Sequence, residues 1–182
     1  MSERGEGENK NESKNANRNG NGNGNGNGNE SLEAIEALKA ELGKAILEVR
    51  QPREGRIFVK IEREALRKAV AVLMNRGFIH LTTITGIDLG NELELLYHLD
   101  RNGRLLSLSV KVPEEKPTIP TITDLIPGAT LYEREVHDLL GIVFEGHPNL
   151  SRLVLPEDWP EGLYPLRKKY SVEDIRKALG GG

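Results

Sequence analysis

Two neighbouring runs of residues restrict what this chain of 182 residues can fold into. Residues 92–99 alternate apolar and polar side chains, a pattern typical of a strand with one packed and one wetter face. A second such run, 105–112, follows the dipeptide Asn102-Gly103, which is favoured in tight hairpin turns because both residues tolerate a positive φ. Together with a third strand-like run at 78–89, these features predict an antiparallel sheet.

Helical patterns flank the predicted sheet. Ser31 is placed to cap a helix whose apolar residues recur at helical spacing as far as Gly43. Residues 62–76 form a second amphipathic pattern. Between them, 46–49 and 57–61 have the composition of two short strands. We therefore expect helices that pack against one face of the sheet.

A third helix and a long arm are predicted after the sheet. Thr130 and Glu133 have the spacing of a capping box, which predicts a helix to about Leu140 that ends at Gly141. Residues 142–170 are punctuated by proline and glycine, so we expect an irregular arm there and a short helix from Ser171. The fold class is thus α+β: an antiparallel sheet with helices packed against it, followed by a long irregular C-terminal arm.

The arm carries more apolar side chains than a plain loop. They are Phe144, Leu150, Leu153, Val154, Leu155, Trp159, Tyr164 and Leu166. Such side chains are expected to be buried, either on the arm's own domain or against another protein. Its prolines stiffen the arm, and a stiff segment loses less entropy on binding than a flexible one. We expect docking to another chain, with an arm folded back on its own sheet as the alternative.

Residues 1–29 form a separate region that contains five consecutive Asn-Gly pairs from Asn19 to Gly28. This composition lacks the apolar area needed to offset the entropy of ordering. The predicted organisation is therefore a disordered Asn/Gly-rich tail, 1–29, and one domain, 30–182.

Composition excludes several classes of function. The chain has no cysteine, which removes thiolate ligands for iron–sulfur clusters, Cys-type zinc sites and disulfides. Its 25 basic and 28 acidic residues give a net charge of -3, which argues against nucleic-acid binding. No apolar run approaches the roughly 20 residues of a membrane span, so we expect membrane contact only through partners.

The densest polar cluster, around residues 133–138, leaves two interpretations open. Glu133 and His137 lie four residues apart on the predicted helix, and His147 follows in the next loop, so the three are candidate metal ligands of a free-standing enzyme. Alternatively, Glu133 is the capping-box acid and its neighbours form ion pairs. No nucleophile motif of the Gly-x-Ser-x-Gly type is present.

Several segments closely resemble the signature of the complex I 30-kDa subunit family, a component of NADH dehydrogenase. The clearest are Tyr132-Glu-Arg-Glu-Val-His-Asp-Leu-Leu-Gly-Ile142, Gly146-His-Pro-Asn-Leu150 and Tyr164-Pro-Leu-Arg-Lys-Lys-Tyr170. The resemblance covers about residues 56–170. It implies an α+β domain bound peripherally at the cytoplasmic face of the cell membrane, acting as a non-catalytic scaffold of an ion-translocating oxidoreductase.

The resemblance also implies partners and cofactors. The partners are a hydrogenase-like large subunit of the 49-kDa type, a small iron–sulfur subunit and membrane subunits. This chain would hold no cofactor, and iron–sulfur clusters, with or without nickel–iron, would belong to the partners. The family motif falls on residues that we assign to folding and subunit contact. They are Glu133, Arg134, Glu135, Asp138, Gly141, Gly146, His147, Pro148, Arg152, Pro165, Leu166, Arg167 and Lys168.

Some positions depart from the NADH-linked pattern. His137 stands where those members usually have an aromatic residue, Leu140 where they often have Phe, and Lys169-Tyr170 replaces a Lys-Asp pair. These features are more similar to archaeal membrane-bound hydrogenases and sulfane reductases, so ferredoxin is as plausible a donor as NADH. The acceptor is left open among quinone, protons and sulfur species. A soluble adaptor outside any redox complex is a further alternative.

Overall fold

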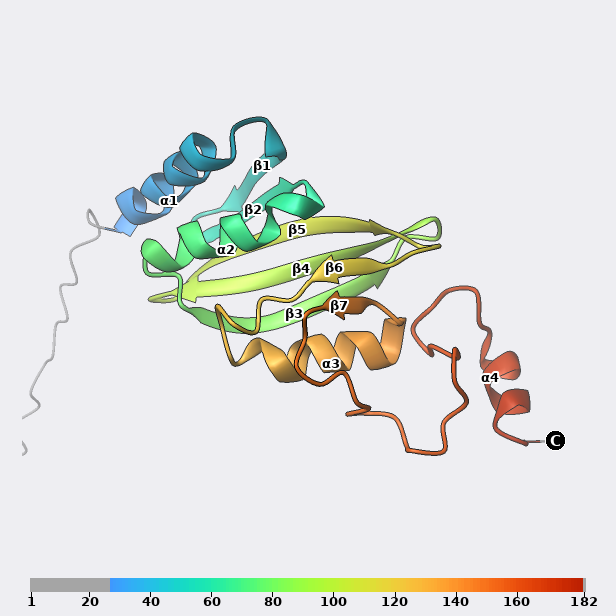
Figure 1. The fold of residues 1–182 in the computed structure, drawn as a ribbon. Coiled ribbons are helices and arrows are strands. Elements are labelled where there is room, and N and C mark those ends of the chain that lie inside the picture. Colours follow the sequence, from blue (N-terminus) through green and yellow to red (C-terminus); the bar gives the residue numbers. More distant parts are fainter. Residues whose placement is uncertain (1–26, 182) are drawn as a thin grey trace, which may run out of the picture.

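The computed structural model describes residues 27–181 of the chain (Figure 1). In chain order, with η for a 3-10 helix, the elements are α1 (Asn27–Leu42), η1 (Gly43–Ala45), β1 (Ile46–Arg53), β2 (Arg56–Ile61), η2 (Arg63–Ala65), α2 (Leu66–Asn75), β3 (His80–Asp88), β4 (Glu92–Arg101), β5 (Arg104–Pro113), β6 (Thr118–Pro120), α3 (Ala129–Leu140), β7 (Val143–Glu145) and α4 (Val172–Ala178). Most of the predicted tail lies outside the described residues, and 27–29 open α1.

The main sheet has five strands in the order β1-β2-β5-β4-β3. The antiparallel meander β3-β4-β5 is as predicted, and at its β4–β5 turn Asn102 and Gly103 have φ values of 53° and 81°. The prediction of a wholly antiparallel sheet is wrong, because β2 pairs with β5 in parallel. Side-chain alternation is the same in both kinds of pairing, so the sequence did not distinguish them.

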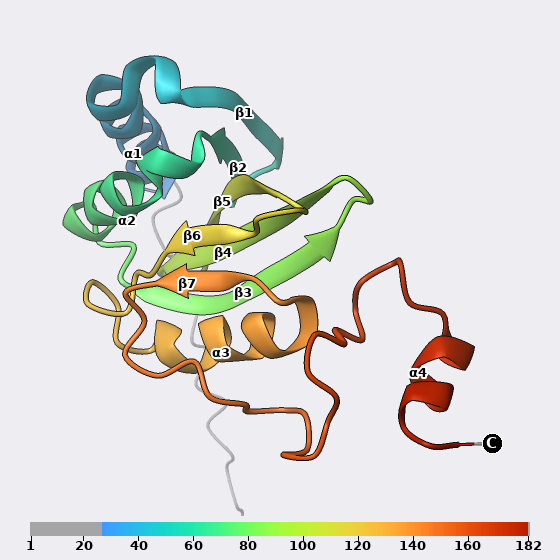
Figure 2. The ribbon, with the colours of Figure 1, turned by 45° about the vertical axis from the view of Figure 1, so that its right-hand side comes forward.

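A second, two-stranded sheet is formed by parallel pairing of β6 with β7. It lies between α2 and α3 in front of the main sheet (Figures 1 and 2). The arm is therefore not irregular from its start, since Phe144 pairs with Ile119 in this ladder. From residue 146 to 170 the described chain has turns and bends but no helix or strand.

The core lies between the main sheet and its helices. The inward residues of β4, from Leu93 through Leu95 and Tyr97 to Leu99, are 0% exposed, as their alternation predicts. α1 and α2 pack together over the β1-β2-β5 half of the sheet, and α3 runs beside β3 (Figure 2). The arm then passes α3 and leads to α4, far from α1 (Figure 1).

Two predicted helix caps are wrong and one is confirmed. Ser31 does not cap α1, because the helix begins at Asn27 and Ser31 is buried within it. α3 begins at Ala129, and the Thr130 hydroxyl donates to the carbonyl of Pro127, 2.8 Å away. By contrast, Ser171 and Asp174 form a capping box at the start of α4.

Candidate docking site

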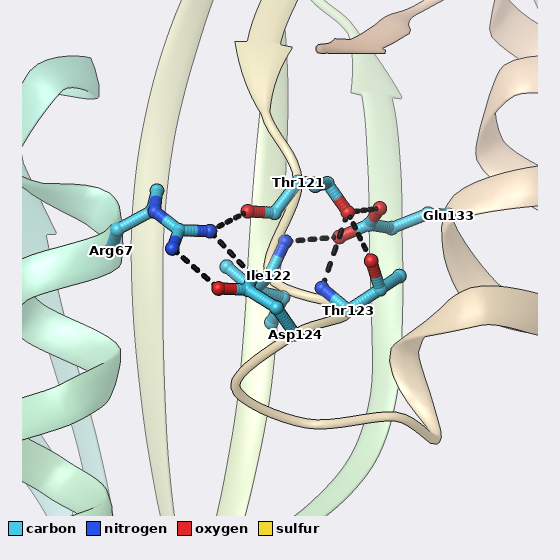
Figure 3. Close-up of polar contacts among 6 residues, drawn as sticks. All are labelled: Arg67, Thr121, Ile122, Thr123, Asp124 and Glu133. Carbon is cyan, nitrogen blue, oxygen red and sulfur yellow. Dashed lines mark hydrogen bonds and ion pairs between the residues drawn. The ribbon is translucent and has the colours of Figure 1, made fainter. Parts of the chain in front are cut away.

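The motif residues meet where the buried side of α3 contacts two segments without long strands. Glu133 of α3 is 0% exposed and contacts the loop that follows β6 (Figure 3). Its carboxylate accepts from the Thr121 hydroxyl at 2.5 Å and from the Ile122 amide at 2.9 Å. Burial raises the pKa of Glu133, and these two hydrogen bonds oppose the rise. The predicted capping role of Glu133 is thus replaced by a contact with an upstream loop.

The same loop is fixed from its other side by α2. The Arg67 guanidinium binds both carboxylate oxygens of Asp124, at 2.6 and 2.7 Å, and the carbonyl of Thr121 at 2.6 Å (Figure 3). The hydrogen bond from Arg67 lowers the pKa of Asp124 to about 2. The loop is therefore held between α2 and α3 by charged side chains from both helices.

The arm is clamped to α3 by Asp138 and Arg134. One oxygen of Asp138, Oδ2, accepts from the amides of Leu153, Val154 and Leu155 at 3.1, 2.8 and 2.8 Å. One turn earlier, Arg134 donates to the carbonyl of Ser151 at 2.9 Å and to that of Arg152 at 2.6 Å. We call residues 151–155, with these two α3 side chains, the first clamp.

The amides of the first clamp favour the ionised form of Asp138. Burial would raise the pKa of Asp138, but the amides of Leu155, Val154 and Leu153, together with the Arg152 charge, outweigh it and hold the pKa below its ordinary value. Asp138 is only 6% exposed. A charge in such a position requires this degree of hydrogen bonding.

A second clamp, Asp88 with Glu114 and Arg167, holds the far end of the arm. Arg167 is 4% exposed, and its Nε donates to the carbonyl of Leu140 at 2.6 Å. Its Nη1 lies 3.4 Å from Glu114, within ion-pair distance but without hydrogen-bond geometry. Asp88, at the end of β3, accepts from the amide of Lys168 at 2.8 Å. Residues 80 positions apart in sequence are thereby joined.

Gly141 lets the arm pass close to the end of α3. It caps the helix with a φ of 72°. A Cβ at this position would meet the Tyr164 ring at 2.4 Å. Glycine is required here both for the backbone conformation and for the approach of the arm.

The three candidate metal ligands contact three different groups. Glu133 binds the loop after β6, His137 Nδ1 lies 2.8 Å from the carbonyl of Ile142, and His147 Nε2 lies 3.2 Å from the carbonyl of Thr130. Within residues 27–181 there is no group of three His, Cys, Asp or Glu side chains that could hold a metal ion. The proposed ligands are therefore not brought together.

The other motif residues divide by exposure. Glu135, Gly146, Pro148, Leu166 and Lys168 are exposed, whereas Arg152 and Pro165 are half-buried. The arm buries Phe144 and Leu163 on its own domain but leaves Leu153, Val154 and Leu166 between 41% and 55% exposed. Both interpretations of the arm thus apply, to different side chains.

Sequence reasoning missed Arg67, Asp88 and Glu114 as members of these contacts. Each acts on residues more than 50 positions away, and none has a spacing that marks its partner. Only the loop 119–124 carried a signal, through its match to the family pattern.

The sheet, the three helices packed on it and the doubly clamped arm define a structural domain of the complex I accessory type. The chain belongs to the family described as the respiratory-chain NADH dehydrogenase 30 Kd subunit, whose sequence profile matches residues 59–176.

Relatives of known role support this membership. The corresponding NADH-quinone oxidoreductase subunit of a Nocardioides species is 33% identical over 163 residues, covering 82% of this chain and 64% of the relative. NADH-quinone oxidoreductase subunit 5 of Thermus thermophilus is 40% identical over 132 residues, covering 65% and 63%. The chain thus spans less than two thirds of these relatives.

Two solved structures are also similar. A trypsin-resistant fragment (1-134) of Nqo5 matches with a TM-score of 0.57 and 34% identity over 66% of this chain and 99% of the fragment. A chain of the membrane-bound sulfane sulfur reductase, an archaeal respiratory membrane complex, matches with a TM-score of 0.71 and 27% identity over 81% and 89%. Among the described helices of this chain, none has the length and apolarity to cross a membrane.

Proposed function

We propose that this chain is a non-catalytic structural subunit of a membrane-associated, ion-translocating oxidoreductase. It binds the hydrogenase-like large subunit of that complex at the cytoplasmic face of the membrane. Iron–sulfur clusters, with or without nickel–iron, reside in the large and small partner subunits. The membrane subunits complete the assembly and provide the contact with the bilayer.

The observation that carries this proposal is how the motif side chains are used. Arg134, Asp138 and Arg167 all bind backbone groups of the chain itself. Side chains engaged in this way fix the path of an arm, and an arm with a fixed path presents its exposed side chains in one arrangement to a partner. The effect of Arg134 or Arg167 on assembly is then indirect, through the arm, rather than through a direct ion pair with a partner.

Purification from the native host tests the proposal. A tagged chain is expected to retrieve a large subunit, a small iron–sulfur subunit and membrane subunits, all identified by mass spectrometry. The chain expressed alone is expected to be colourless and without a redox signal. Recovery of the tagged chain as a lone monomer from native membranes would contradict the proposal, and stoichiometric metal in the isolated chain would favour a metal-dependent enzyme.

The electron donor and acceptor follow from the partner rather than from this chain. We propose ferredoxin or NADH as donor, and quinone, protons or a sulfur species as acceptor. The sequence of the large subunit separates these cases. Paired Cys-x-x-Cys motifs at both of its ends indicate a nickel–iron hydrogenase, and their loss indicates quinone or sulfur chemistry.

A further inference from the structure

The first clamp leaves an apolar patch on the surface. Leu153 is 41% exposed and Val154 is 53% exposed, although the amides of both donate to buried Asp138. Leu131, which lies one turn before Arg134 on α3, is 55% exposed. We call these three side chains the clamp patch. Because its backbone is hydrogen-bonded to α3, the patch has a defined shape before any partner arrives.

The segment that follows the patch is acidic. Glu157, Asp158 and Glu161 lie within five consecutive residues and are exposed. None of them forms an ion pair with another residue of the described range 27–181. The segment 156–162 contains no lysine or arginine. The patch is thus followed by an acidic edge whose charge the described part of the domain does not balance.

A hollow of about 280 Å³ separates this acidic edge from α3. Its lining includes the Trp159 ring, Leu155 and Glu161. The Trp159 indole is fixed by a hydrogen bond from its Nε1 to the carbonyl of Leu163, 2.8 Å long. Such a hollow suits a side chain with an apolar stem and a positive end, because the stem packs on the ring and the charge reaches the carboxylate.

We propose that the clamp patch and its acidic edge together bind an apolar surface bordered by lysine or arginine on a different subunit of the complex. This inference rests on the proposed function and names the surface and the chemistry of the partner. A second copy of the chain fits poorly, since a patch placed symmetrically against itself brings two acidic edges together. The apolar centre supplies burial and the acidic edge supplies orientation.

Photo-crosslinking in the native complex tests the surface directly. A benzoylphenylalanine placed at Val154 is expected to crosslink to another subunit, at an apolar peptide that has Lys or Arg close by. The matched control is the same group at Val172, which is 70% exposed on α4 and outside the patch. We expect its crosslinking yield to be about tenfold lower, as for positions outside an interface centre.

Two sets of variants test the chemistry. The pair Leu153→Ser and Val154→Ser is expected to reduce the assembled fraction about tenfold, while Val172→Ser with Leu179→Ser leaves it unchanged. Reversal of Glu157 and Asp158 to lysine is expected to weaken assembly most at low salt, since salt screens exposed charges. Circular dichroism of each isolated variant shows whether its fold is retained.

The outcomes separate this inference from the proposed function. An intact complex in which only the Val172 position crosslinks, or in which the Val154 position crosslinks to a second copy of this chain, overturns the inference and leaves the proposed function standing. Absence of any complex in the unmodified strain refutes the proposed function itself. Serine variants that assemble normally also overturn the inference.

Discussion

At the scale of single residues, the domain uses buried charge to hold backbone that has no regular pairing. Glu133 binds the loop after β6, Asp138 binds the arm, and Asp88 binds the end of the arm. Each of these three residues is at most 6% exposed. A buried carboxylate without such partners would cost several kcal/mol, so position and hydrogen bonding are coupled at all three sites.

The close approach at Gly141 gives a prediction with a matched control. Gly141→Ala is expected to lower the free energy of unfolding by about 2–4 kcal/mol, because the added Cβ meets the Tyr164 ring and the φ of 72° is strained. Gly162→Ala has a similar φ of 75° but no atom within 4 Å of its Cβ, so we expect a loss of about 1–2 kcal/mol. Urea unfolding measures both. Equal losses would show that the Tyr164 contact relaxes freely.

At the scale of elements, the first clamp should behave as a local unit. Asp138→Ala removes the acceptor of three amides, so the arm is expected to detach while the sheet stays folded. Trp159, the only tryptophan of the chain, reports on the arm through a red shift of its fluorescence. Hydrogen exchange at 153–155 is expected to rise by at least about tenfold, the equivalent of about 1.4 kcal/mol.

The control for the clamp variant is Glu135→Ala on the same helix. Glu135 is exposed, and its loss is expected to leave both the fluorescence and the exchange rates unchanged. Unchanged exchange in Asp138→Ala would mean that other contacts hold the arm.

The sequence predicted elements better than their contacts. The β4–β5 hairpin was predictable because Asn102 and Gly103 determine the turn locally. The parallel pairing of β2 with β5 was not, since it joins segments about 50 residues apart and leaves the alternation unchanged. Likewise, the Thr130–Glu133 spacing is that of a capping box, but the Ile122 amide is the actual partner of Glu133. Contacts of this kind depend on how the loop and the helix meet in space.

The polar residues of the docking site follow the same rule. Arg134 and Asp138 were identified from the family motif, yet their partners are backbone groups of the arm. Backbone amides and carbonyls carry no residue-specific signal, so no sequence pattern could point to residues 151–155 as their partners.

At the scale of the whole molecule, the pKa shifts predict a fold that weakens in acid. Asp88 and Asp138 have folded-state pKa values below their ordinary ones, so each stabilises the fold above pH about 4 and loses that contribution as the pH falls further. Glu133 has a raised pKa and the opposite sign, since its ionisation disfavours the fold as the pH rises. With two groups against one, we expect lower stability at about pH 3 than at about pH 7.

Urea unfolding at about pH 7, 5 and 3 measures this dependence. Replacement of both Asp88 and Asp138 by asparagine is expected to flatten the slope below about pH 5, because these two linked protonations are then removed. An unchanged slope in the double variant would assign acid lability to other groups.

The parallel contact between β2 and β5 has a consequence for synthesis. During translation Arg56–Lys60 leaves the ribosome long before Leu105–Ser109, its neighbour in the sheet. The β1–β2 hairpin must therefore wait, with one edge unpaired, until the meander has formed. The nascent chain thus has a period in which its first half is vulnerable to aggregation, and chaperones have a reason to meet it there.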